Sequence, residues 1–336
     1  MKHFYPILSS IFYLALCSCT KYSAIEENNH SLSSLNSRKA ADSSATLLFN
    51  SGFENASSVI PIGTGSQGEQ LTGIDHSVSA PNNWDTFGST SFPGPTKIYY
   101  EGGDSSMRYA RIVNDPKRPS NKVLKFWLAD SNVIGKSKGR IQMDAYNGSG
   151  VKELYQSVRL LLDSNLKQLK FWNVAFTQFT LFELWNNKVW NNAPAAFRIS
   201  LNIVKPSNIS GSNLYLRLTA QKHNASGSYS TVWDTTAFTY QIPFGKWARF
   251  EYYIKEGNEQ NGRFYLAITP EGVSKATVFD IHNYTHSPDA TTTDGITDIN
   301  PMKLYTNSGV INYLKGKEIP IQVYWDDFEL WKNKKP

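Results

Sequence analysis

The sequence predicts an all-β protein built as an antiparallel β-sandwich. Apolar and polar side chains alternate in many short segments, as in strands that bury one face. Turn-forming residues separate these segments, and the apolar spacing of amphipathic helices is almost absent. Such strands pack as sandwiches or jelly rolls because a second sheet must cover the apolar face.

Composition fits one large all-β domain. The chain has 336 residues, of which 13% are aromatic and 18% are charged, with a formal net charge of +6. Three of the positive charges, Lys332, Lys334 and Lys335, lie at the C-terminus, and no block of like charge occurs elsewhere. We therefore expect no nucleic acid partner.

The N-terminus is predicted to be a lipoprotein signal peptide over residues 1–19. Residues 4–16 form an apolar run that is too short to span a membrane. The sequence Leu16-Cys17-Ser18-Cys19 resembles the lipobox of bacterial lipoproteins, which makes Cys19 the lipidated residue. The alternative is an ordinary secretory signal whose cysteines are incidental. The lipobox implies a protein anchored to the bacterial outer membrane by lipid alone, with the cell surface as one orientation.

Residues 20–45 are predicted to be a flexible linker, because they are rich in Ser, Asn and Ala and lack apolar periodicity. One domain is expected over residues 46–336. No cysteine follows Cys19, so no disulfide can stabilise this domain.

Along the domain, residues 46–49 are predicted to form a first strand and residues 57–83 a long loop region. Trp84 and Phe87 follow as apolar anchors or ligand platforms. Further strands are predicted at 123–129, 139–146, 154–162, 169–184, 197–204, 213–221, 247–255 and 263–269.

The C-terminal segment 319–331 is predicted to be a strand with an acidic kink. Ile321, Val323 and Trp325 are apolar at alternate positions, and after Asp326-Asp327 the apolar phase shifts to Phe328 and Leu330. A shift of one residue exchanges the two faces of a strand, and a β-bulge is the usual cause.

The polar faces of the predicted strands carry side chains that suit a sugar ligand. Guanidinium groups pair with carboxylates, and aromatic rings stack on sugar rings. These properties predict a polysaccharide partner, with acidic polysaccharides among the candidates. The candidate binding residues are Tyr146, Arg198, Asn202, Tyr215, Arg217, Arg249 and Tyr265, joined by Trp185 and Trp190 in a polar loop. If their strands share one sheet, the strand residues line its concave face; otherwise they are solvated residues of an outer face.

A family resemblance rests on short motifs: Gly139-Arg140-Ile141-Gln142, Leu154-Tyr155-Gln156-Ser157, Gly245-Lys246-Trp247 and Gly262-Arg263-Phe264-Tyr265. They resemble motifs of the concanavalin A-like jelly rolls, and most closely those of Bacteroidetes polysaccharide lyases and their non-catalytic relatives. The resemblance implies a jelly roll over residues 46–336. The sequence departs from many such lyases at Gln142, where they carry the Glu of an Arg-x-Glu motif. The strand 197–204 also lacks the Gln-x-His of alginate-lyase-like members.

A lyase that acts by β-elimination needs three roles. A neutraliser screens the uronic carboxylate, a base removes the neighbouring proton, and an acid protonates the leaving oxygen. Arg140 and Gln142 are the candidate neutralisers, Tyr253 or His223 the candidate base, and Lys255 an assisting group. His223 lies in a segment that reads as a polar loop.

Three functions remain open at this point. Binding of polysaccharide is our first prediction, and a polysaccharide lyase acting on uronic-acid-containing glycans is the alternative. A structural protein of the cell envelope is the third. A glycosidase is less favoured because the Glu-x-Asp-x-x-Glu pattern of jelly-roll glucanases is absent.

A structural Ca²⁺ ion is predicted between the two ends of the domain. The segment from Asn50 to Glu54 and the acidic C-terminal strand resemble a pair found in jelly-roll carbohydrate-binding modules, where calcium joins them. The resemblance implies Glu54, Asp326 and Asp327 as ligands, and calcium prefers such oxygen donors.

Overall fold

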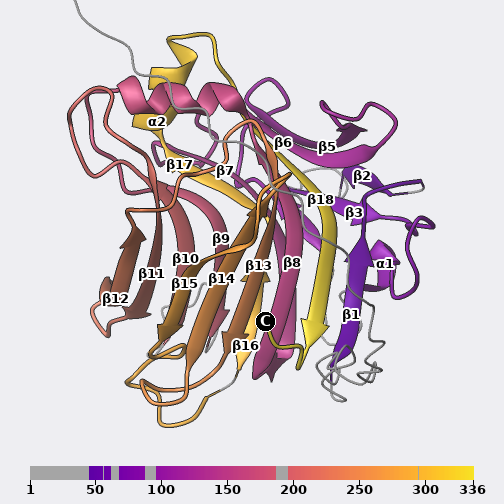
Figure 1. The fold of residues 1–336 in the computed structure, drawn as a ribbon, viewed down its shortest axis with the longest axis vertical. Helices are drawn as coiled ribbons and strands as arrows, with labels where there is room; N and C mark the ends of the chain where they lie inside the picture. The colour runs from indigo at the N-terminus through magenta and orange to yellow at the C-terminus, as the bar shows by residue number, and fades with distance from the viewer. Residues whose placement is uncertain (1–44, 56, 62–67, 88–95, 187–195, 294) are drawn as a thin grey trace, which may run out of the picture. The chain divides into compact units, whose positions relative to one another are not determined.

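The computed structural model describes residues 45–55, 57–61, 68–87, 96–186, 196–293 and 295–336, with the backbone alone at 146–149. Cys19, the predicted signal peptide and all but the last residue of the predicted linker lie outside these ranges. In the described part, two antiparallel sheets enclose one shared apolar core (Figure 1). The predicted all-β, antiparallel sandwich is confirmed.

Sheet A has eight strands within the described residues, in the order β15-β14-β13-β8-β18-β6-β5, with β1 also paired to β18. The last strand of the chain, β18, therefore lies inside the sheet (Figure 1). The bounds are β1 (Thr46–Ser51), β5 (Arg108–Asn114), β6 (Lys122–Leu128), β8 (Glu153–Leu162), β13 (Trp247–Lys255), β14 (Arg263–Pro270), β15 (Ala276–His282) and β18 (Ile321–Lys332).

Sheet B has ten strands within the described residues, with a main order of β12-β11-β10-β9-β16-β7-β4-β3-β2. Both β16 and β17 pair with β7 and β9, so they occupy one strand position that is interrupted at Pro301 and Met302. Proline has no N–H to continue a ladder. The bounds are β2 (Ser58–Pro61), β3 (Gly68–Thr72), β4 (Lys97–Tyr99), β7 (Lys138–Val151), β9 (Phe179–Asn186), β10 (Phe197–Val204), β11 (Tyr215–His223), β12 (Tyr229–Ala237), β16 (Ile296–Asn300) and β17 (Lys303–Asn307).

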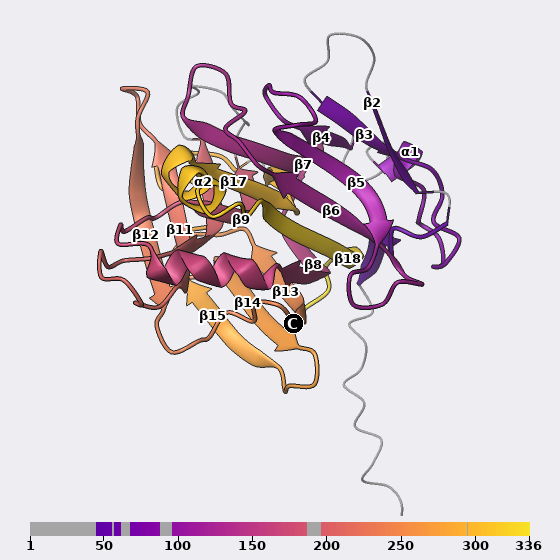
Figure 2. The ribbon, with the colours of Figure 1, turned by 90° about the horizontal axis from the view of Figure 1, so that it is seen from above.

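Three short helical segments accompany the sheets in the part of the chain that the structure describes. They are α1 (Trp84–Phe87), the 3₁₀ helix η1 (Ser164–Phe171) and α2 (Ser308–Lys315). Viewed from above, η1 crosses the strand ends with α2 nearby (Figure 2), and Trp172 after η1 stacks on Tyr313 of α2 with ring centroids 5.4 Å apart. None of the described helices has both the length and the apolar character that crossing a membrane requires.

The acidic kink predicted in the C-terminal strand is confirmed. The ladder between β18 and β8 shifts between Asp326 and Glu329, and Asp327 has a φ of 45°. Trp325 before the shift and Phe328 after it are both fully buried. The residues before the shift pair with β6 and those after it pair with β1. The bulge therefore lies where β18 changes its neighbour along one edge.

Two predictions of secondary structure are wrong. The expected loop region 57–83 contains β2 and β3, which pair with each other; strands this short, with few apolar residues, leave little alternation to detect. The expected strand 169–184 is the end of η1 followed, after a gap, by β9. Trp84 and Phe87 are buried anchors, and Trp84 stacks on Phe328 with ring centroids 6.2 Å apart.

Candidate functional site

The predicted surface residues do not share one sheet. Those in sheet B are Arg140, Gln142, Tyr146, Arg198, Asn202, Tyr215, Arg217 and His223. Those in sheet A are Arg249, Tyr253, Lys255 and Tyr265. The condition for one composite face, that these strands share a sheet, is therefore not met. Alternation shows which side chains share a face of their strand, but it does not show which sheet the strand joins.

Strand register places the polar side chains of sheet B in rows on the face turned away from the core. One row crosses β17, β9, β10, β11 and β12 through Tyr305, Thr180, Asn202, Arg217 and Thr236. The next row holds Glu183, Ser200, Thr219 and Asp234. A third row holds Trp185, Arg198, Gln221 and Thr231. Because backbone ladders fix these positions, the surface is preorganised.

These rows line a cavity of about 350 Å³, which we name the sheet B groove. Of its thirteen lining residues, eight carry a neutral hydroxyl or amide, four are charged and one is aromatic. The lining is Lys138, Thr177, Gln178, Thr180, Glu183, Arg198, Ser200, Asn202, Arg217, Thr219, Gln221, Thr231 and Tyr305. No aliphatic residue of the described chain belongs to it, so its recognition chemistry is hydrogen bonding.

Opposite charges are paired in and beside the groove. The ion pairs are Arg217–Asp234, Lys303–Glu183 and Arg140–Glu101. Arg198 lies 3.6 Å from Glu183, measured from Nη1 to Oε1, and it also donates to the Gln221 amide oxygen at 2.7 and 2.9 Å. The groove thus presents placed donors and acceptors, with Arg198 and Arg217 beside acids and Lys138 over the Tyr305 ring.

A buried polar network connects the groove to β7 and β16. Lys303 and Glu183 are both almost fully buried, and Lys303 Nζ also donates to Asn300 Oδ1 at 3.1 Å. Asn300 and Gln142 each donate to Asp144 Oδ1, at 2.6 and 2.7 Å. These hydrogen bonds hold their members in one arrangement, although Gln142 Oε1 has no hydrogen-bond partner among the described residues. Gln142 is therefore part of this support, and it is fully buried.

The surroundings of Glu183 lower the pKa of this carboxyl, which favours its ionised form. Burial alone would raise its pKa, but the Lys303 ammonium and the Arg198 guanidinium outweigh burial and hold the pKa below the usual value. Burial also lowers the pKa of Lys303, against the attraction of Glu183.

Arg140 lies at the β7 side of the groove. Its guanidinium carbon is 4.7 Å from the ring centroid of Tyr305 and 5.7 Å from that of Tyr99. With Glu101 at 2.9 Å, this cation is held between an acid and two aromatic rings. Tyr253, its expected catalytic companion, lies in the other sheet.

A His–Tyr pair lies one row beyond Gln221. His223 pairs with Tyr229 across the β11–β12 hairpin, and their ring centroids are 5.0 Å apart. The guanidinium carbon of Arg198 is 4.3 Å from the Tyr229 centroid. His223 is 3% exposed, and its Nδ1 has no hydrogen-bond partner among the described residues. Neither ring belongs to the lining of the groove.

The His223–Tyr229 pair was not predicted from the sequence, because His223 was expected to lie in a loop. The strand β11 extends to His223, whose backbone N–H donates to Ala196 O at 2.8 Å. A Gln-x-His spacing is present as Gln221-Lys222-His223, on the strand next to the one where the resemblance led us to expect it. That spacing, which puts both side chains on one face, was the available signal.

Burial raises the pKa of Tyr229 above its ordinary value, with Arg198 opposing and Glu183 adding to the effect. The phenol is therefore protonated at neutral pH and can donate a hydrogen bond.

The predicted tryptophan platforms receive little support. Trp185 lies on β9 and is only 1% exposed, so the interpretation of it as an exposed loop platform is wrong. Its ring centroid is 5.5 Å from the Arg198 guanidinium carbon and 6.0 Å from the Tyr229 centroid, so these side chains lie against it. Trp190 lies outside the described residues. Tyr146 is placed by its backbone, opposite Asp298.

The sheet A residues have local partners of their own. Tyr253 donates to Glu153 at 2.8 Å, and Arg249 donates to Ser157 at 2.9 Å. Tyr265 lies 3.3 Å from the Thr277 hydroxyl, and Lys255 is exposed. These contacts within the protein explain the positions of the Tyr253, Arg249 and Tyr265 side chains, and no ligand is needed to explain them.

Among the predicted calcium ligands, Glu54 and Asp326 both lie close to Gly52. A Cβ at Gly52 would be 3.7 Å from Glu54 Cγ and 3.9 Å from Asp326 Oδ1. Burial, followed by the charge of Asp327, raises the pKa of Asp326 to about 7. A cation beside Asp326 would offset this cost, so the pair fits calcium as oxygen donors.

The predicted calcium site is limited to Glu54 and Asp326, because arginines already lie close to the two aspartates. Arg159 already lies 3.2 Å from Asp326 Oδ2, and Asp327 faces Arg159 and Arg249 at 3.5 and 3.7 Å. Among the described residues, no group of three or more His, Cys, Asp or Glu side chains is arranged to hold a metal. Backbone carbonyls would have to complete the site.

No family model matches the chain, and no curated protein matches its sequence. Solved structures do resemble its fold. A PL-14 alginate lyase from Aplysia kurodai is 12% identical, with a TM-score of 0.47 over 77% of this chain and 97% of that one. An endo-β-1,4-glucuronan lyase from Trichoderma reesei is 14% identical, with a TM-score of 0.42 over 70% and 90%. A GH131 β-glucanase catalytic domain from Podospora anserina is 13% identical, with a TM-score of 0.36 over 85% and 95%.

Proposed function

We propose that this protein binds a polysaccharide in the sheet B groove. The lining of the groove carries this proposal: eight neutral hydroxyl or amide side chains are fixed on paired strands and nearby loops, and Tyr305 lies at one side. Sugar hydroxyls need many donors and acceptors at set positions, and an aromatic ring can stack on the apolar face of a pyranose. Because the ion pairs of the groove are internal, its recognition of sugar hydroxyls does not depend on the charge of the glycan.

Calorimetry of the full chain with neutral and uronic-acid oligosaccharides tests the proposal. Thr219→Ala and Thr231→Ala each remove one hydroxyl from the groove lining. Each is expected to weaken binding roughly 2- to 10-fold, as one net hydrogen bond would. Thr277→Ala, at an exposed position on sheet A, is the matched control and should bind as the unmodified chain does. Equal binding by all four proteins would place the ligand elsewhere, and binding of no oligosaccharide would reject the proposal.

A second candidate function is β-elimination at a uronic acid, and the His223–Tyr229 pair favours it. Arg198 and Gln221 would neutralise the carboxylate, His223 Nδ1 would accept the α-proton, and the protonated Tyr229 would donate to the leaving oxygen. This assignment replaces the expected set of Arg140, Gln142, Tyr253 and Lys255, which the structure does not bring together. We rank it second because the pair is set back from the groove lining.

Incubation of the full chain with alginate and glucuronan separates the two functions. A lyase produces an unsaturated uronate that absorbs in the ultraviolet, whereas a binding protein produces none. Retardation of the protein in a glycan-containing gel without such absorbance would support binding alone.

The location of the protein is proposed from its N-terminus. We infer export and lipidation at Cys19, which the lipobox-like Leu16-Cys17-Ser18-Cys19 supports. Cys19→Ser should move the protein from the membrane fraction to the soluble fraction and abolish labelling with a radioactive fatty acid. Unchanged labelling would remove this assignment.

A further inference from the structure

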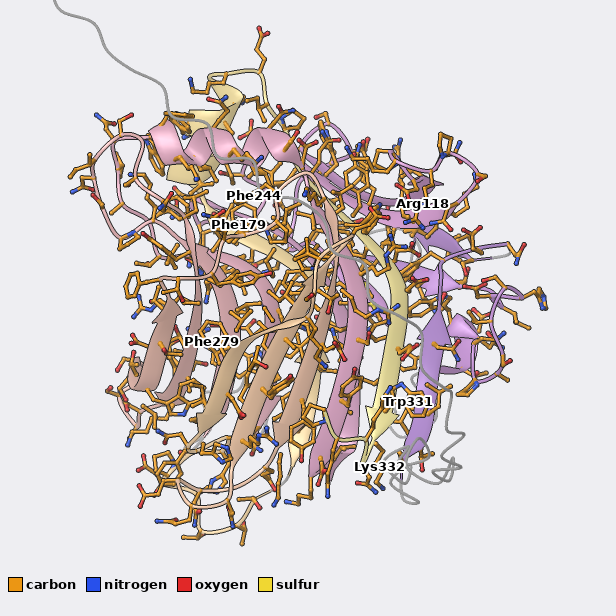
Figure 3. All side chains as sticks on the ribbon, in the orientation of Figure 1. Arg118, Phe179, Phe244, Phe279, Trp331 and Lys332 are labelled. Atoms are coloured by element: carbon orange, nitrogen blue, oxygen red, sulfur yellow. The ribbon has the colours of Figure 1, made fainter. Side chains whose placement is uncertain are left out.

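A second cavity, of about 780 Å³, lies where η1, the ends of β11 and β12 and the β14–β15 turn approach one another. We name it the η1 pocket. Figure 3 shows Phe244, one of its lining residues, just below η1 and far from Lys332 at the other end of the molecule. The lining is Lys167, Lys170, Asn213, Leu214, Tyr215, Phe238, Thr239, Tyr240, Gln241, Ile242, Pro243, Phe244, Lys246, Pro270, Val273, Ser274 and Ala276.

One wall of the η1 pocket is aromatic and exposed. Phe238 is 63% exposed, and its ring meets that of Tyr215 edge to face, with centroids 5.0 Å apart. Val273, across the pocket on the β14–β15 turn, is 53% exposed. Large apolar side chains left in water at the rim of a cavity favour a ligand with an apolar face.

The rim of the η1 pocket is cationic. Lys167, Lys170 and Lys246 belong to the lining, and none of its seventeen described residues is acidic. Lys170 donates to Asn213 Oδ1 at 3.1 Å, while Lys167 and Lys246 are exposed and make no ion pair with any described residue. This differs from the sheet B groove, where acids lie beside two of the three lining cations, Arg198 and Arg217. The η1 pocket therefore favours an anionic group on its ligand.

A buried hydroxyl adds a polar contact inside the pocket. The Tyr240 hydroxyl is buried and has no hydrogen-bond partner among the described residues. A buried polar group without a partner costs free energy, so a rearrangement that exposed this hydroxyl to a ligand oxygen would remove that cost.

The η1 pocket continues from the sheet B groove along β11. Arg217 lines the groove and Tyr215 lines the pocket. They are two residues apart on the same face of the strand, which is about 7 Å at the usual rise per residue. One extended chain of sugars can therefore contact both.

We propose that the η1 pocket binds a carboxylate-bearing pyranose of the same polysaccharide that occupies the groove. The apolar face of the ring stacks on Phe238, and the carboxylate meets Lys167 and Lys246. This proposal rests on the proposed function of the groove and adds the substrate class, a uronic-acid polymer. The pocket binds the carboxylates of the polymer, and the groove binds its hydroxyls.

Calorimetry of the full chain with a uronic-acid oligosaccharide and its carboxyl-reduced counterpart of equal length tests the proposal. The unmodified protein should bind the uronic form about 10-fold more tightly, because hydrogen bonds to charged groups are the stronger ones. The double variant Lys167→Gln/Lys246→Gln should lose this preference and bind the reduced form as before. The double variant Lys136→Gln/Lys332→Gln removes two exposed charges elsewhere and should keep the preference. Phe238→Ser should weaken binding of both forms.

If the double variant Lys167→Gln/Lys246→Gln still prefers the uronic form over the reduced form, the proposed role of the η1 pocket is wrong. It is also wrong if a medium-chain fatty acid binds in the η1 pocket and the oligosaccharide does not compete with it. If Thr219→Ala still weakens binding in that case, the groove proposal stands and only the pocket assignment fails. If neither form binds any protein, the proposed function itself fails.

Discussion

Lys303 and Glu183 form an ion pair between the adjacent strands β17 and β9, at side-chain exposures of 2% and 7%. Glu183 also lines the sheet B groove. The pair thus links the middle of sheet B to the surface on which we place the ligand.

Glu183→Gln is expected to destabilise the protein by about 3–5 kcal/mol, because it leaves the Lys303 ammonium buried without its counter-charge. Chemical denaturation measures this change. The double variant Glu183→Leu/Lys303→Met removes both charges and should recover most of the lost stability. A double variant as unstable as Glu183→Gln would show that other contacts of these side chains, and not the unpaired charge, cause the loss.

If the chain cleaves uronic acid polymers, Tyr229→Phe and His223→Ala should each lower kcat at least 100-fold, because each removes a proton-transfer group. Tyr253→Phe, on sheet A, is the matched control and should retain activity. The rate of ultraviolet absorbance increase gives the result. Loss of activity in Tyr253→Phe alone would move the reaction to sheet A.

Asp75 is expected to make stability depend on pH in the acid range. Its carboxylate accepts hydrogen bonds from the Ser51 hydroxyl, the Gly52 and Glu54 amides, and Ser77. Burial opposes ionisation, but these bonds outweigh burial and lower the pKa from 3.8. The stabilisation is therefore present above pH 3.8 and is lost as the pH falls through the lower pKa of the folded state.

Comparison with the variant Asp75→Asn isolates the contribution of the ionised Asp75 carboxylate to the free energy of unfolding. The difference in unfolding free energy between the unmodified chain and this variant should be largest at neutral pH and should shrink in acid. Asp85→Asn, at an exposed carboxylate of α1, is the control and should change the pH profile little. A difference that is the same at neutral and acid pH would refute the role of the Asp75 charge.

If calcium joins Glu54 and Asp326, EDTA should lower the melting temperature by about 5 °C or more, and added Ca²⁺ should restore it. Glu54→Gln should remove this sensitivity. Asp104→Asn changes an exposed acid away from Gly52 and should retain it. A melting temperature that EDTA does not change would discard the metal.

The sequence predicted the strands with clean alternation well. The predicted strands 197–204 and 247–255 coincide with β10 and β13, because every second residue there is apolar and buried. The kink at Asp326 was predictable because one phase shift separates two buried sets. The strands β2, β3 and β4 were missed because three to five residues give too little periodicity.

The candidate site was predicted in part. Arg198, Asn202 and Arg217 lie in the groove, but Arg249 and Tyr253 belong to the other sheet. Assignment of a strand to a sheet depends on long-range pairing, such as that of β18 with β8, and alternation within one strand holds no information about it. Lys303 was not predicted because a single lysine in a short segment is usually exposed to solvent. In the structure it is buried, and Glu183 is its ion-pair partner.

The position of β18 has a consequence for folding. This strand lies between β8 on one side and β6 and β1 on the other. Until residues 321–332 have left the ribosome, β5 and β6 have no partner that connects them to β8, β13, β14 and β15 within sheet A. The two parts then expose unpaired strand edges, which are prone to aggregate. Sheet A is therefore completed only when residues 321–332 pair, and deletion of this short segment would leave the sheet in two pieces.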